Sequence, residues 1–217
     1  MPGDATVYGP AEIPRKLWNY GLYSLISSTM DYPIFSPPVD LAIKLPKNWS
    51  KLEAEAYFNW FLNIFDKRVN NLLSFLCLGD DQEDSILLSK AQEKCEKLLT
   101  MEQFTFASHA GCKLTNQGYA LAADLGLLVA RLLIKRSHGK VGWNILKKPK
   151  TDQSYNLPVL TGFNVTHFDP ISGSIGDIAW LARGNKKPNA LVKILEFWST
   201  RVGNYGDSSR IEHGRLG

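Results

Sequence analysis

Three titratable side chains are the candidates for catalysis in this chain of 217 residues: Asp124, His167 and Asp169. Asp124 lies in a long apolar run, where a carboxylate must be paired or must reach water. His167 and Asp169 are two residues apart, so they can point to one face of a strand. An imidazole and carboxylates within hydrogen-bond reach of each other act as general acid and base. The set therefore suggests a hydrolase, provided that the fold brings the three side chains together.

Asp124 and Arg131 are the informative polar pair of the apolar run. They are seven residues apart, so on a helix they share one face and are separated by about 10.5 Å along the axis. That separation is too long for a direct ion pair. The spacing favours a narrow solvent-facing stripe on an otherwise buried helix. In the alternative, Asp124 faces a pocket and is satisfied by a residue of the C-terminal sheet.

Established catalytic and metal-binding strings are missing from the sequence. There is no G-x-S-x-G string, and the glycines of Gly173-Ser174-Ile175-Gly176 lack the lysine and the spacing of a phosphate-binding loop. The four histidines and three cysteines show no zinc-ligand spacing. We therefore predict no metal and no cofactor, and we favour a role other than catalysis.

Positive charge gathers in the second half of the chain. Residues 1–134 hold 12 basic and 15 acidic side chains, whereas residues 135–217 hold 13 basic and 6 acidic ones. Such an imbalance indicates a partner with an acidic surface, or two halves of the chain that face each other. The predicted partner-binding residues are Lys135, Arg136, Lys140, Trp143, Lys147, Lys148 and Lys150.

Two other interpretations of this basic segment stay open. Lysines interleaved with an aromatic such as Trp143 could bind a single-stranded nucleic acid through phosphate contacts and stacking. A net charge of only +4 argues against a dedicated nucleic-acid binder. The lysines could also belong to a solvated hairpin edge, where they suppress aggregation.

Apolar residues recur with a helical period in the first half of the chain and predict three helices. The first begins at Ser50, where Ser50 and Glu53 have the spacing of a capping box, and continues to about Leu76. The second covers Glu83–Leu99, and the third runs from Thr115 or Asn116 to about Arg136. The third has a run of only 16 residues with two charges inside, so we predict a buried core helix and not a membrane span.

Extended patterns prevail after Gly139. They predict strands at Val141–Leu146, Leu157–Leu160 and Phe163–Phe168, followed by helices at Ile175–Ala182 and Pro188–Arg201. Shorter strands are expected at Val39–Leu45 and Phe104–Phe106.

The predicted fold class is α+β, with a helical N-terminal half packed with a small, mostly antiparallel C-terminal sheet and flanking helices. We expect one domain over 1–217. Its parts are an irregular wrapping segment (1–49) with a short helix around Leu17–Ser27, a helical part (50–136), the sheet with the C-terminal helices (137–202), and a frayed tail (203–217).

Composition and patterning together favour a protein-interaction module. A hydrophobic share of 44% excludes disorder, and three cysteines exclude a disulfide scaffold. The N-terminus has no secretory signal, so we expect a cytoplasmic protein that is not bound to a membrane. We predict an immunity-, antitoxin- or inhibitor-like binding protein of bacterial or phage type. The alternatives are a hydrolase that uses Asp124, His167 and Asp169, and a nucleic-acid binder that uses residues 135–150.

Overall fold

A computed structural model describes residues 31–109 and 111–203 of the chain. The helix expected around residues 17–27 and the tail expected to fray after Gly203 lie outside these residues. The structure has the α+β fold that the sequence predicts, with helices and two small antiparallel sheets. The elements are α2 (Val39–Ala42), the 3-10 turn η1 (Pro46–Asn48), α3 (Lys51–Phe75), α4 (Asp84–Leu98), β1 (Thr105–Ser108), β2 (Gly111–Leu114), α5 (Asn116–Arg136), β3 (Gly142–Ile145), β4 (Pro158–Thr161), α6 (Pro170–Ala182) and α7 (Ala190–Ser199).

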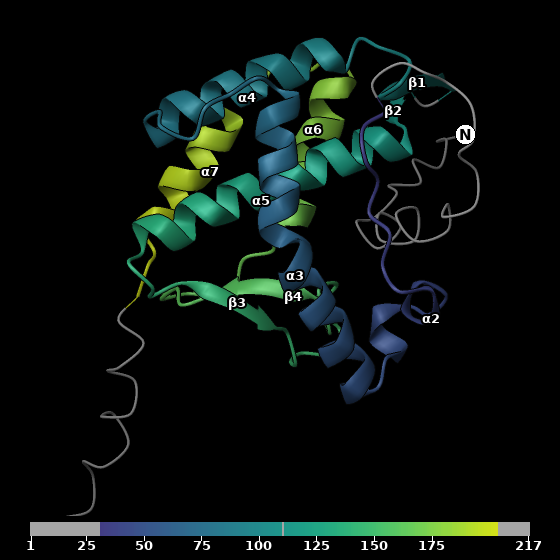
Figure 1. Ribbon diagram of the computed structural model, residues 1–217, viewed down its shortest axis with the longest axis vertical. Coiled ribbons are helices and arrows are strands. Elements are labelled where there is room, and N and C mark those ends of the chain that lie inside the picture. The colour runs from purple at the N-terminus through teal and green to yellow at the C-terminus, as the bar shows by residue number, and fades with distance from the viewer. Residues whose placement is uncertain (1–30, 110, 204–217) are drawn as a thin grey trace, which may run out of the picture.

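Helix α5 is the central element, and α3, α4, α6 and α7 pack around it (Figure 1). It starts where the sequence predicts, with the Thr115 side chain accepting a hydrogen bond from the Gly118 amide. Its length and composition would allow it to span a membrane, but 78% of its most apolar stretch is buried within the protein. That burial is the arrangement of a core helix in a soluble protein.

The start of α6 lies very close to the middle of α5. A side chain added at Gly126 would place its Cβ 2.8 Å from the Pro170 carbonyl carbon and 3.1 Å from the Ile171 Cα. The glycine therefore lets the backbone of α6 lie directly against the core helix.

Helix α3 contributes side chains to two apolar clusters. Its capping box is formed, because the Ser50 hydroxyl accepts from the Glu53 amide and the Glu53 carboxylate accepts from the Ser50 amide. The C-terminal two thirds of the helix pack into the main core around α5. Its first turns form a separate small cluster with α2 and the residue after η1, and this cluster is composed of Leu41, Trp49, Ala54 and Tyr57.

The strands form two antiparallel hairpins, β1–β2 and β3–β4, which do not join into one sheet. The third strand predicted at Phe163–Phe168 is absent. Only single bridges form there, from Phe163 to Val202 and from Phe168 to Leu160. Gly162 at φ +105° turns the chain out of line with β4, and the segment after it pairs with that strand only at Phe168.

The strand predicted at Val39–Leu45 is a short helix instead. Only Leu41 of α2 is buried, while Val39 and Ile43 face solvent. Residues 39, 41 and 43 would share one face of a strand, but they are not buried together. The helical turn is closed by bonds from the Leu41 and Ala42 amides to the Pro38 carbonyl.

Two glycine substitutions test the packing of α6 on α5. We expect Gly126→Ala to destabilise the protein by about 1–3 kcal/mol, because the new methyl group overlaps the Pro170 carbonyl. Gly176→Ala is the matched control, since a Cβ there meets nothing within 4 Å and alanine gains up to about 1 kcal/mol of helix propensity. Urea denaturation measures both. Equal effects of the two substitutions would contradict the close approach.

Candidate functional site

Asp124 is fully buried and bonded to two side chains from earlier in the chain. Arg68 of α3 donates from Nε to Oδ1 at 2.8 Å and from Nη2 to Oδ2 at 2.6 Å. The Tyr32 hydroxyl donates a third bond, to Oδ2. The prediction that Asp124 lies on a solvent-facing stripe is therefore wrong. The alternative, a partner from the C-terminal sheet, is also wrong, because both partners come from the N-terminal half.

Arg68 also holds the segment that precedes α2. Its Nη1 donates to the carbonyls of Pro33 at 2.7 Å and Ile34 at 3.2 Å, and the guanidinium lies 4.2 Å from the centroid of the Phe35 ring. Tyr32 packs edge-on against an aromatic ring of α3. The ion pair therefore joins α3, α5 and residues 32–35. Its arrangement is structural, since every polar atom of the carboxylate is already bonded within the protein.

Burial raises the pKa of Asp124 to about 6, in spite of the opposing influence of Arg68 and the Tyr32 hydroxyl. Desolvation also raises the pKa of Tyr32, and the negative charge of Asp124 adds to that rise. A carboxyl with a raised pKa can mark a catalytic acid. Here the group has no access to solvent, so we assign it no substrate.

His167 and Asp169 are not bonded to this ion pair and have other partners. Asp169 caps α6 by accepting from the amides of Ile171 at 3.1 Å and Ser172 at 3.0 Å, and it accepts a bond from the Ser154 hydroxyl at 2.6 Å. His167 lies 3.5 Å from a carboxylate oxygen of Asp152. Among the residues described, no hydrogen bond or ion pair joins any two of Asp124, His167 and Asp169. The structure thus does not join the three residues of the hydrolase hypothesis into an acid–base set.

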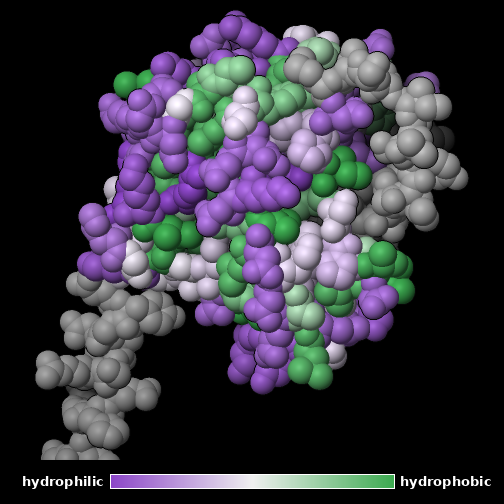
Figure 2. All heavy atoms as spheres, viewed as in Figure 1, coloured by the Kyte–Doolittle hydropathy of each residue, from purple (hydrophilic) through white to green (hydrophobic). Residues whose placement is uncertain are grey.

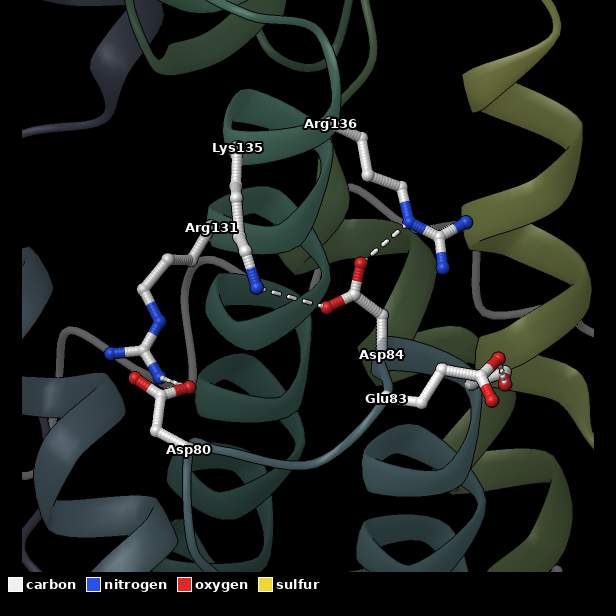
Figure 3. Close-up of polar contacts among 7 residues, drawn as sticks. Asp80, Glu83, Asp84, Arg131, Lys135 and Arg136 are labelled. Atoms are coloured by element: carbon white, nitrogen blue, oxygen red, sulfur yellow. Dashed lines mark hydrogen bonds and ion pairs between the residues drawn. The ribbon is translucent and has the colours of Figure 1, made fainter.

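Two of the predicted partner-binding residues form ion pairs within the protein. Lys135 and Arg136, at the end of α5, bond to the two carboxylate oxygens of Asp84, at 3.3 and 2.6 Å (Figure 3). One α5 turn earlier, Arg131 pairs with Asp80 at 3.1 Å. Burial favours the neutral form of Asp84, but the hydrogen bonds from Arg136 and Lys135 hold its pKa below the ordinary value. These cations therefore attach the α3–α4 connection, through Asp80, and the start of α4, through Asp84, to the core helix.

Trp143 is also directed inward. Its ring packs edge-on against Phe61, with centroids 4.8 Å apart, and against Phe65 at 5.5 Å. The indole is thus part of the contact between β3 and α3. An exposed ring face would be needed for stacking on a base.

The remaining lysines lie on the connection between β3 and β4, which we call the basic loop (residues 147–156). Lys147, Lys148 and Lys150 are exposed, and no ion pair to another described residue involves them. Lys140, the other predicted partner-binding lysine, lies before β3 and is exposed as well. Five of the seven predicted residues are therefore exposed cations, because Lys135 is exposed although it is paired with Asp84. Three of the five share one loop.

The basic loop is fixed to the body from its inner side. Asn156, buried and at φ 66°, donates from its side chain to the Pro46 carbonyl at 2.9 Å and the Trp49 carbonyl at 3.3 Å. Its amide donates to the Leu146 carbonyl at 2.8 Å and closes the loop. The buried Ser154 bonds to Asp169, as described above. The three lysines are therefore displayed on a loop whose inner side is bonded at several points.

No cluster of three or more potential metal ligands occurs within residues 31–109 and 111–203. A hollow of about 350 Å³ lies between α4 and the α6–α7 connection, lined by Glu96, Leu99, Leu181 and residues 184–188. It contains none of the candidate catalytic residues. No family model, curated protein or solved structure matches the chain.

The buried ion pair predicts a large effect of removing one partner. Arg68→Met should cost about 3–5 kcal/mol of unfolding free energy, because Asp124 is then left buried without its cation. Arg131→Met, which removes a partly exposed pair, should cost at most about 1 kcal/mol. The double variant Arg68→Met/Asp124→Leu should be less destabilised than Arg68→Met alone. Guanidinium denaturation measures all three, and a double variant worse than the single one would contradict this account.

The raised pKa of Asp124 predicts a specific pH dependence. Between about pH 4 and 6 the folded protein keeps a proton that the unfolded chain has released, so this group's contribution to stability falls as the pH rises through that window. Above pH 6 the contribution is constant. We expect the stability of the native chain relative to Asp124→Asn to decrease from pH 4 to 6. If the difference in unfolding free energy between the two proteins increased over this range, the charge of Arg68 would outweigh burial in setting the pKa of Asp124.

Proposed function

We propose that the chain is a protein-interaction module that binds an acidic protein surface through the basic loop. The observation that carries this proposal is the fixed display of Lys147, Lys148 and Lys150 by a loop bonded to the body through Asn156 and Ser154. A surface that is ordered before binding loses little conformational entropy on association. Clustered cations steer and orient an acidic partner.

The position of Trp143 favours a protein partner over a nucleic acid. Binding to single strands combines phosphate contacts with stacking on exposed rings, and this indole packs against α3 instead. The hydrolase alternative has less support, since its three residues have separate structural partners.

We further propose a cytoplasmic, immunity-, antitoxin- or inhibitor-like role. Cys77, Cys95 and Cys112 are free thiols, as is usual in a reducing compartment. The aromatic ring contacts and the buried ion pair give a rigid body, which suits a protein that acts by occupying a partner's surface. The +7 balance of residues 135–217 suits a partner with an acidic face.

Charge reversal in the basic loop tests the proposal. The full chain is mixed with the products of the genes beside its own, and complexes are measured by calorimetry. We expect Lys147→Glu/Lys148→Glu to weaken a complex at least about tenfold, because attraction becomes repulsion. Lys186→Glu/Lys193→Glu, an equal charge change at exposed positions elsewhere, is the control.

Two outcomes would contradict the proposal. One is a complex that withstands reversal of the loop lysines as well as it withstands the control substitutions. The other is tight binding of an oligothymidylate that weakens steeply with salt and is lost in the loop variant, which would identify a nucleic-acid partner instead.

A further inference from the structure

The exposed side of α2 lies at the same end of the molecule as the basic loop. Leu41, the buried residue of α2, packs in the small cluster with Trp49 and Tyr57. Ile145 and Leu157, which flank the two ends of the basic loop, pack against that same cluster. Asn156 adds hydrogen bonds to the carbonyl of Pro46, the first residue of η1, and to that of Trp49, which follows η1. The small apolar cluster and the Asn156 hydrogen bonds thus hold the α2–η1 segment and the basic loop together.

Two aliphatic side chains point away from this junction. Val39 and Ile43 are four residues apart on one side of α2, opposite the buried Leu41, and they are 76% and 77% exposed. Figure 2 shows strongly hydrophobic residues at the surface where Figure 1 labels α2. Leu52, at the start of α3, is exposed to the same degree at 77%, whereas Ile86 and Trp180 are only about half exposed.

A fourth exposed lysine lies on the α2–η1 segment, next to the residue that bonds to the basic loop. Lys47 belongs to η1, whose Pro46 carbonyl accepts the bond from Asn156. It is exposed and makes no ion pair with a described residue, whereas the nearby Lys44 is paired with Glu53. Asp40 is the acidic residue of α2. The end of the molecule therefore combines two aliphatic side chains with lysines on one flank.

We infer that α2, η1 and the basic loop form one docking surface for an acidic protein segment that carries aliphatic side chains. This inference rests on the proposed function and adds the apolar half of the interface. Val39 and Ile43 contact the aliphatic residues of the partner, while Lys47 and the loop lysines contact its carboxylates. Interfaces of this kind draw their binding energy from an apolar centre and their orientation from a charged rim.

The exposed lysines favour an acidic protein segment as the partner, because its charge is complementary. The shortness of α2 argues against an anionic lipid surface. A helix of four residues is about 6 Å long, and interfacial helices that bind membranes present a much longer apolar face. The lysines of the surface also lie on a turn and a loop and not along the polar face of such a helix.

Two labelled peptides test the inference with the full chain. One consists of glutamates with interspersed leucines, and the other has serine in place of each leucine at the same charge. By fluorescence anisotropy we expect the leucine peptide to bind at least about tenfold more tightly, since aliphatic side chains gain from burial. Val39→Ser/Ile43→Ser should remove that preference and leave binding of the serine peptide unchanged. Ile86→Ser, on α4, is the control, and circular dichroism checks that each variant folds.

The outcomes separate this inference from the proposed function. Equal binding of both peptides, or a leucine preference that survives Val39→Ser/Ile43→Ser, overturns the apolar half of the surface while the basic loop stands. Failure of both peptides to bind, or indifference to Lys147→Glu/Lys148→Glu, overturns the proposed function as well. Binding of phosphatidylserine vesicles, lost in Val39→Ser/Ile43→Ser, in place of the leucine peptide would assign the surface to a membrane.

Discussion

The fold depends on one buried ion pair, Arg68 with Asp124. Both side chains are almost completely removed from water, and each charge has its partner and further hydrogen bonds. Such a pair adds little net stability, because desolvation offsets most of the Coulomb attraction. The raised pKa of Asp124 reflects that cost. What the pair supplies is specificity, since only one register of α3 against α5 satisfies both charges and the carbonyls of residues 33–34 together.

A second buried polar contact fixes the structure near the other end of α3. Asn156 is a buried residue whose side-chain amide donates to the backbone at the first residue of η1 and at the residue after it, more than 100 residues earlier in the chain. A buried polar group without partners is costly, so this contact strongly disfavours other positions of the basic loop. Both contacts join distant parts of the sequence through polar groups that accept few alternatives. The core helix and the displayed loop are consequently parts of one rigid arrangement.

The sequence predicts the helices well because their apolar periodicity and caps are local. The Ser50 capping box and the start of α5 at Thr115 are formed as expected. The partner of Asp124 could not be found this way, because Arg68 lies 56 residues away. A signal was present, however: Arg68 lies between Phe65 and Leu72 on the apolar side of α3. One cation and one carboxylate on the buried faces of two helices predict a pair.

Charge counting alone also misjudged which cations face a partner. Residues 135–150 looked like one basic surface, yet Lys135 and Arg136 neutralise Asp84, the first residue of α4 (Figure 3). The imbalance between the halves is therefore partly an attraction within the molecule. The lysines of the basic loop have no such counterpart among the described residues, and the loop's inner bonds hold them outward. A docking surface differs from a solvent-exposed hairpin edge in having cations without an ion-pair partner on a loop that is bonded to the body. The total charge of a segment does not make that distinction. On that criterion the β3–β4 connection, and not the end of α5, is the place where this chain would contact an acidic partner.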